Sequence, residues 1–265
     1  MFNIIGKIQD KCEQKKGYKN GVILGRKNGR ISIDDSYSSV FAIAKDRREI
    51  FEGSIIPTIL NWQNNLIIFD FKDELYDLTS KYRENIGEEV IRVSKKNINQ
   101  VIQVINEILN KKRYSLYICI SSLEENSFKE RIKFLIEKIL KNRKEIIESA
   151  LFILPYFNIL GESQIIKESV YLDRKEKNLK IYFISDVDSL IEAKYNIPIL
   201  FGSLDNKLLF SSDLEEYKNF KFLQYLIEEI KPKTNELLYF NHFQNTKLRK
   251  IKYYEEKYFM KKINL

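Results

Sequence analysis

The sequence has little of what metal sites, disulfide frameworks and flexible linkers require. It contains two cysteines and one histidine in 265 residues, a content that supplies neither a zinc-ligand pattern nor a disulfide framework. Four prolines and nine glycines leave little material for long flexible linkers. We therefore expect no bound metal and no other cofactor.

Long hydrophobic runs are also missing. The longest unbroken apolar runs are about five residues, whereas a membrane-spanning helix needs about 20. The first residues, MFNIIGKIQDKCEQKK, hold too short an apolar patch for a secretion signal. We expect a cytoplasmic protein, either free or peripheral to a membrane-bound complex.

What the sequence does contain is typical of a folded protein. Apolar residues make up 44% and charged residues 31% of the chain, which separates it from disordered sequences. The net charge is +8, but the lysines are scattered among acidic residues. A polyanionic partner is therefore permitted and not required.

Apolar runs alternate with stretches of helical periodicity along most of the chain. Strands are predicted at 40–44, 66–70, 88–94, 115–121, 150–157 and 179–185, and near 199–203 and 236–240. Helices are predicted up to 62, and at 73–87, 97–112, 126–147, between 157 and 179, and around 214–230. Continuous apolar strands between helices indicate a parallel sheet covered on both faces. The predicted fold is therefore α/β and doubly wound, with a mostly parallel sheet.

One strand in this series ends in charge, within NLIIFDFKDELYDLTSKYR at 65–83. The apolar run stops at Asp70, and Lys72, Asp73 and Glu74 follow. Strands that end in this way in α/β proteins often deliver charged groups to a nucleotide site.

Several segments resemble the TraG-type coupling proteins of conjugative type IV secretion. The pattern IIPTIL, followed by FDFKDELYDLTSKYR, is similar to that family's "VIPTLL" and "LDPKGELYELTAGYR". The similar segments, in the family's order, are 21–35, 54–83, 115–140, 151–166, 181–195 and 247–259. The resemblance implies a RecA-like or P-loop-NTPase-like core. Within it, Asp70, Lys72 and Glu74 are retained family residues, expected to pair with one another and nearby groups and to cap the following helix.

The nucleotide chemistry of that family is not retained. A phosphate loop needs glycines, a lysine for the phosphates and a hydroxyl for Mg²⁺. An ungapped count from Pro57 places the loop on Ala44, Lys45, Asp46, Arg47, Arg48, Glu49, Ile50 and Phe51. Ile50 takes the lysine position and Glu49 the glycine before it. Arg47 and Arg48 could be substitute phosphate binders, but a solvated helix start is the simpler interpretation.

The second acidic motif is replaced as well. Where the family has the Asp-Glu pair that holds Mg²⁺ and polarises water, this sequence has Pro155 and Tyr156. Asp186 stands at the family's glutamine position. We therefore predict a pseudo-ATPase with no catalytic residues.

The resemblance also predicts how the domains are organised. We expect residues 1–20 to be an N-terminal extension and residues 21–265 to form a single degenerate nucleotide-binding-like domain. The family's transmembrane helices and inserted all-helical domain are not expected here, since one predicted helix at 97–112 bridges the interval where the insert would lie.

Three functions remain open. The first is an inactive scaffold or accessory subunit in conjugative DNA transfer, either monomeric or oligomeric, whose partners would be an intact coupling ATPase or other secretion components. The second is an ATPase with a rebuilt site, in which Asp70, Asp73 and Glu74 would bind Mg²⁺.

The third is a nucleic-acid-binding accessory protein of a mobile element. Basic and aromatic residues alternate near the C-terminus, which is an arrangement that contacts phosphates and stacks bases. The candidate contacts are Lys247, Arg249, Lys250, Lys252, Tyr253 and Tyr254. In the resembling family this segment is the terminal strand, where the tyrosines would be structural.

Overall fold

The structure is a computed structural model of the whole chain. It describes residues 17–70, 72–94, 98–109, 111–119, 125–146, 149–155, 179–192, 204–210, 217, 220–241 and 245–265. The strand predicted near 199–203 and the helix predicted between 157 and 179 lie outside these residues.

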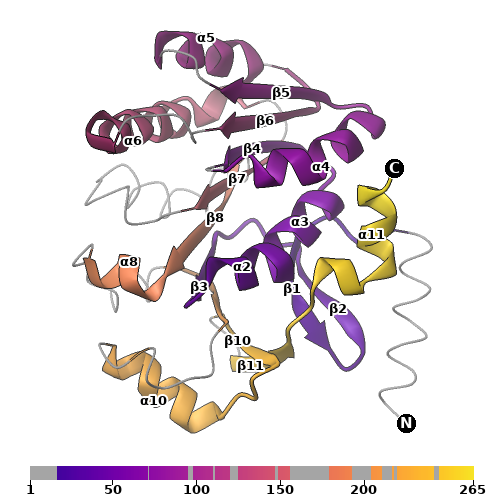
Figure 1. Cartoon of the computed structure of the whole chain (residues 1–265), viewed down its shortest axis with the longest axis vertical. Helices are drawn as coiled ribbons and strands as arrows, with labels where there is room; N and C mark the ends of the chain where they lie inside the picture. The colour runs from indigo at the N-terminus through magenta and orange to yellow at the C-terminus, as the bar shows by residue number, and fades with distance from the viewer. Residues whose placement is uncertain are drawn as a thin grey trace.

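The described strands form one sheet in the order β2-β1-β11-β10-β9-β3-β8-β7-β4-β6-β5 (Figure 1). Their bounds are β1 (Val22–Lys27), β2 (Arg30–Asp34), β3 (Val40–Ala44), β4 (Asn65–Asp70), β5 (Glu89–Ser94), β6 (Tyr114–Cys119), β7 (Ala150–Pro155), β8 (Leu179–Asp186), β9 (Asn206–Leu209), β10 (Glu236–Phe240) and β11 (Asn245–Arg249). The helical segments are α2 (Arg47–Ile50), η1 (Phe51–Ile55), α3 (Ile56–Asn61), α4 (Glu74–Asn85), α5 (Ile98–Leu109), α6 (Glu125–Lys141), η2 (Arg143–Glu145), α8 (Val187–Glu192), α10 (Lys221–Ile230), η5 (Tyr253–Glu255) and α11 (Lys257–Ile263).

The sheet has a parallel part and an antiparallel part. Strands β9, β3, β8, β7, β4, β6 and β5 pair in parallel. Strands β2, β1, β11 and β10 extend the sheet beyond β9 with antiparallel pairings. The mostly parallel sheet predicted from the sequence is confirmed, and the antiparallel extension is an addition to it.

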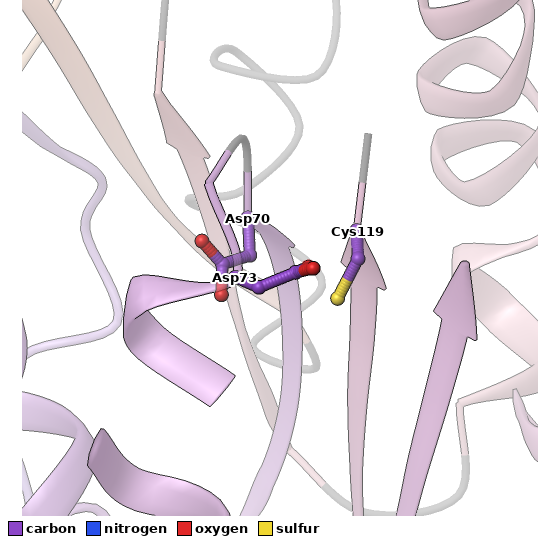
Figure 2. A group of neighbouring side chains, drawn as sticks. All are labelled: Asp70, Asp73 and Cys119. Atoms are coloured by element: carbon purple, nitrogen blue, oxygen red, sulfur yellow. The ribbon is translucent and has the colours of Figure 1, made fainter. Parts of the chain in front are cut away.

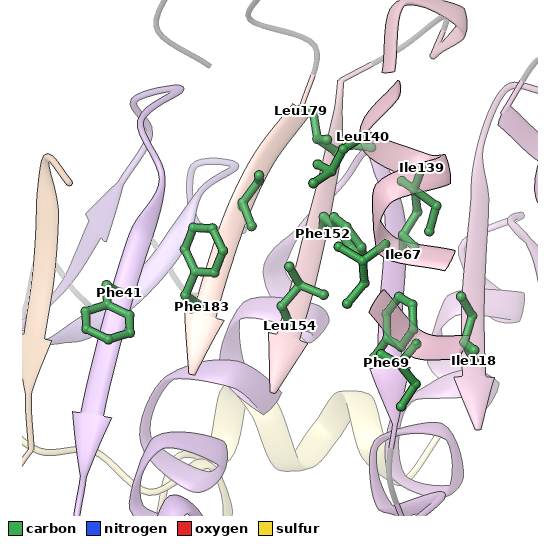
Figure 3. Packing of buried hydrophobic residues seen from close by; sticks show 14 of the residues in the cluster. Phe41, Ile67, Phe69, Ile118, Ile139, Leu140, Phe152, Leu154, Leu179 and Phe183 are labelled. Carbon is green, nitrogen blue, oxygen red and sulfur yellow. The ribbon is translucent and has the colours of Figure 1, made fainter. Parts of the chain in front are cut away.

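Both faces of the sheet are covered, as the continuous apolar strands predicted. One buried cluster joins the strands to residues of α5, α6, α8 and α10. The other joins them to residues of α2, α3, α4 and α11. Neighbouring strand residues contribute to opposite clusters: Phe41 and Ile67 to the first, Ala42 and Ile68 to the second. Figure 3 shows the first cluster, with side chains of β3, β4, β7 and β8 lying side by side.

The helix after β3 is continuous but not regular. Segments α2, η1 and α3 follow one another without a break, and η1 is a π-helical turn. The N–H of Ile56 donates to the carbonyl of Phe51, five residues earlier. Pro57 has no N–H, and in a regular α-helix its ring would crowd the carbonyl four residues before it. The wider π-turn relieves this crowding without ending the helix.

The far end of α4 is fixed by a buried arginine. The side chains of Arg83 and Glu88 are fully buried and form an ion pair, with Arg83 Nε donating to Glu88 Oε2 at 2.8 Å. Arg83 Nε also donates to Ser115 Oγ of β6 at 3.0 Å. The remaining N–H groups of Arg83 donate to the carbonyls of Ile59, Trp62 and Asn64. One side chain thus joins α4 to the end of α3 and to the sheet.

The C-terminal segment departs from the expected terminal strand. Strand β11 ends at Arg249, and Tyr253 and Tyr258 lie in η5 and α11. Tyr258 packs edge-on against Tyr18, with ring centroids 4.7 Å apart. Within the described residues, no helix has both the length and the apolar character needed to cross a membrane.

Candidate functional site

Two strand–helix junctions meet at the carboxyl edge of the parallel strands, the edge at which α/β proteins bind ligands. A cavity of about 330 Å³ lies there, between the junction after β3 and the junction after β4. Its lining residues are Lys45, Asp46, Arg47, Arg48, Phe51, Phe69, Asp70, Lys72, Glu74, Leu75 and Asp186. The structure therefore brings the predicted loop positions, the retained framework residues and Asp186 together.

The junction after β3 is too short to be a phosphate loop. The strand ends at Ala44, and only Lys45 and Asp46 precede the first helical residue, Arg47. The carboxylate of Asp46 caps the helix by accepting from the N–H of Arg48 at 2.9 Å. No residue from 44 to 51 is a glycine or has a positive φ. The backbone therefore presents no concave row of N–H groups to a phosphate.

The residue at the lysine position faces away from solvent. Ile50 is fully buried and belongs to the core cluster that includes Ile55 and Ile59. Phe51 follows it and lines the cavity. The side chain that would approach phosphates in the resembling family is therefore part of the hydrophobic core here.

Arg47 was expected to be solvated, but its side chain is only partly exposed and forms an ion pair. Its guanidinium forms an ion pair with the carboxylate of Asp186, at the end of β8. Arg47 Nη2 also donates to Ser189 Oγ at 3.0 Å, and the N–H of Ser189 donates to Asp186 Oδ1 at 2.6 Å. Arg48 is exposed, in agreement with the solvated interpretation. Glu49 accepts from Lys250 Nζ at 2.7 Å.

The junction after β4 holds a buried acid. Asp70 is 3% exposed and accepts from the N–H of Tyr76 at 2.8 Å. Burial raises the pKa of this carboxyl to about 6, against the opposing effect of the backbone N–H groups. Asp70 thus caps the first turn of α4, as expected. The backbone N–H of Lys72 also donates to the Asp70 carboxylate. The side chains of Lys72 and Glu74 are exposed, and within the described part of the chain they form no ion pair with Asp70.

Asp70 lies beside Asp73 and Cys119, which come from the start of α4 and the end of β6 (Figure 2). One ligand atom from each of the three lies within 4.8 Å of the others. Arg92 already supplies a cation here, because its Nη2 lies 2.6 Å from Asp73 Oδ2. Burial raises the pKa of the Cys119 thiol to about 12, which keeps it protonated at neutral pH. A metal would therefore have to displace both Arg92 and the thiol proton.

Only part of the second acidic motif lies within the described residues. Pro155 ends β7 opposite Ile184 of β8, and β7 stops pairing with β4 at Ile153. Pro155 therefore lies beyond the last β4 pair, where its missing N–H leaves no gap on that side. Tyr156 lies outside the described residues.

The predicted nucleic-acid contacts lie in β11 and in the segment that follows it, beside a groove of mixed charge. Lys247, Arg249 and Lys252 are exposed, and Lys252 Nζ lies 5.6 Å from the centre of the Tyr254 ring. A groove of about 550 Å³ runs between this segment and the start of the helix after β3. Its lining includes four acidic and four basic side chains, namely Asp46, Glu49, Glu52, Glu255, Arg48, Arg249, Lys250 and Lys252. The charges balance, and one pair of them, Lys250 and Glu49, is already joined.

Comparison with known protein families supports the resemblance described above for part of the chain. Residues 3–109 match the model of a family described as Type IV secretory system Conjugative DNA transfer. The match covers less than half of the chain and begins within the expected N-terminal extension. A comparison with curated proteins finds no match.

One solved structure has a similar fold, and two others match with lower scores. VirB4 of Thermoanaerobacter pseudethanolicus matches with a TM-score of 0.56 at 10% identity, over 92% of this chain and 100% of that chain. The cytoplasmic domain of the Thermomonospora curvata type VII secretion ATPase EccC gives 0.47 at 8% identity, over 88% of this chain and 26% of that one. The pCW3 conjugation coupling protein TcpA gives 0.43 at 8% identity, over 89% and 67%.

The chain therefore has a fold similar to that of VirB4, built on a mostly parallel mixed sheet. The match over residues 3–109 agrees with the predicted resemblance of this part of the chain to a conjugative DNA-transfer family of type IV secretion.

Proposed function

We propose that this chain is a non-hydrolysing subunit of a type IV conjugative DNA-transfer system, acting as a scaffold or accessory to an intact coupling ATPase. The observation that supports this most is the junction after β3. A helix capped by its own carboxylate, Asp46, occupies the place where a glycine loop would hold phosphates.

The electrostatics of the cavity support the same proposal. Four cationic and four anionic side chains line it, so it offers no net positive field to a triphosphate. Asp46 lies at the start of the helix, where a phosphate would otherwise accept backbone N–H groups, and Arg47 is already paired with Asp186. An added polyanion would have to displace one carboxylate and lie beside others.

The rebuilt ATPase site is less well supported. Asp70 and Asp73 do lie together, but Arg92 occupies the cationic position next to Asp73. Glu74, the third acid of that hypothesis, is not part of the cluster. The balanced charge of the groove beside Lys250 likewise gives no support to DNA binding as the main activity.

Calorimetric titration of the full chain with Mg-ATP tests the absence of nucleotide binding. We expect no saturable heat up to about 1 mM nucleotide, the range of very weak affinities, and no phosphate release above background. An intact coupling ATPase from the same secretion system, titrated in the same buffer, is the positive control. Saturable binding by the wild-type chain would overturn the proposal.

Co-purification tests the accessory role separately. The tagged chain, expressed with that coupling ATPase, should retain it on the affinity column and elute with it in gel filtration. A chain that elutes alone, at every salt concentration tried, would contradict the scaffold role even if nucleotide binding is absent.

A further inference from the structure

Asp186 holds Arg47, which reaches the cavity from the first turn of the helix after β3. The ion pair between Arg47 and Asp186 is partly enclosed, with 21% and 13% of the two side chains exposed. Ser189 completes the arrangement, since its hydroxyl accepts from Arg47 and its N–H donates to Asp186. Both partners line the cavity.

A guanidinium in this position has the chemistry of a phosphate ligand. Its planar fork donates two parallel hydrogen bonds to carboxylates and phosphates alike. In this chain both Nε and Nη2 are directed at one oxygen of Asp186, Oδ2. The carboxylate thus makes the contacts that an oxyanion in the cavity would make.

We propose that Asp186 is the specificity-determining residue that closes this cavity to phosphate-bearing ligands, by acting as a built-in counter-ion of Arg47. The inference rests on the proposed function, since it explains why the site takes no phosphate. A competing anion must break an ion pair whose partners are held in place by the fold, and the displaced carboxylate would then repel it. Removing the charge of Asp186 should therefore convert the site into a weak oxyanion site.

The substitution Asp186→Asn isolates this charge. Asparagine keeps an oxygen that can accept from the Ser189 N–H and is as good a helix cap as aspartate, so α8 should still form. Arg47 then keeps its charge while the negative charge of Asp186 beside it is removed, which favours an anion that takes the place of that charge.

Asp188→Asn is the matched control. Asp188 lies two residues away on α8, is exposed, and does not line the cavity. It removes the same charge from the same part of the protein without touching Arg47. Any effect of net charge alone will appear in both variants.

The probe is inorganic pyrophosphate, titrated by calorimetry and by thermal shift into the wild type, Asp186→Asn and Asp188→Asn. We expect Asp186→Asn to bind pyrophosphate about tenfold more tightly than the other two, which corresponds to about 1.4 kcal/mol. Its melting temperature should rise with pyrophosphate, and the double variant Arg47→Ala/Asp186→Asn should lose both effects.

Equal affinity in Asp186→Asn and Asp188→Asn, or binding that survives loss of Arg47, overturns the inference. If Asp186→Asn does not fold, Asp186→Gln, which has the residue type that the resembling family carries at this position, takes its place. The wild-type titration with Mg-ATP separates the two proposals. Binding there removes the proposed function, whereas no binding there and no gain in the variants removes only the role of Asp186.

Discussion

The two junctions that line the cavity hold their charges in opposite ways. After β4, Asp70 is buried and accepts from the backbone of α4, and the end of that helix is tied down by Arg83. After β3, Asp46 is exposed at the helix start and Arg47 reaches across to Asp186 on another strand. The buried acid of the first junction is satisfied by the backbone of its own helix, whereas the arginine of the second is satisfied across the cavity.

This difference explains why the two junctions resemble the coupling-protein pattern to different degrees. Asp70 and Arg83 hold α3, α4 and the sheet together, so the sequence around them is required by folding whatever the cavity binds. The residues after β3 are partly exposed and bear little of the core apart from Ile50. We therefore expect that they can change without loss of the fold.

The largest effect on stability is expected at the junction after β4, where Arg83 fixes the end of α4. Arg83→Ala leaves Glu88 buried without its cation and should lower the free energy of unfolding by about 3–5 kcal/mol. Chemical denaturation followed by circular dichroism measures it. Lys81→Ala, at an exposed position of the same helix, should change the stability by no more than about 0.5 kcal/mol. Equal losses in the two variants would show that Arg83 is not the anchor of this region.

A smaller loss of stability is expected when a lysine is placed at position 50, in the junction after β3. Ile50→Lys puts a cation into the core and should cost about 3 kcal/mol of unfolding free energy, without creating nucleotide binding. Arg48→Lys, which places the same side chain at an exposed position of this helix, should be nearly neutral. Saturable Mg-ATP binding by Ile50→Lys would contradict the conclusion that the backbone, and not only one side chain, excludes phosphate.

The smallest effect depends on pH and sharpens the contrast between the buried and the exposed acid. Because the pKa of Asp70 is raised to about 6 from an unfolded value near 4, the folded state binds more protons between these values. The stability that this group contributes is therefore greatest below about pH 4 and falls as the pH rises through 6, by at most about 3 kcal/mol.

Asp70→Asn should remove that slope while keeping an acceptor for the Tyr76 N–H. The measurement is the unfolding free energy of both proteins from pH 4 to pH 7, where the difference between them should grow in favour of the variant as the pH rises. Asp77→Asn, an exposed acid on the same helix, is expected to run parallel to the wild type. A constant difference between Asp70→Asn and the wild type would place the pKa of Asp70 outside this range.

Local patterns predicted much of the parallel core. Runs such as VFAIA and NLIIFD became β3 and β4, and the helix expected from Asp73 to Gly87 became α4. These predictions hold because a strand covered on both faces must be apolar along its length. The capping role of Asp70 was also readable, since it stands at a strand end just before a helix.

Other features were not predicted, for two different reasons. The hairpin of β1 and β2 carried a usable signal, because Asn28 and Gly29 form an Asn-Gly turn with positive φ at both residues. The partnership of Arg47 with Asp186 carried none, since 139 residues separate the two and no local pattern links them. Strand β9 is only four residues long and begins with two polar residues, Asn206 and Lys207, so its sequence does not show the apolar run of a buried strand.

The buried arginine of α4 also changes what its motif means. Arg83 sits at the end of the stretch that made the chain recognisable, and every hydrogen bond that the structure gives it goes to a neighbouring part of the same fold. A search pattern built on that stretch therefore identifies the fold and not the activity. Such a pattern will find chains that share this fold, whether or not they hydrolyse nucleotide. The side chains after β3 are the ones to compare in order to separate the two groups.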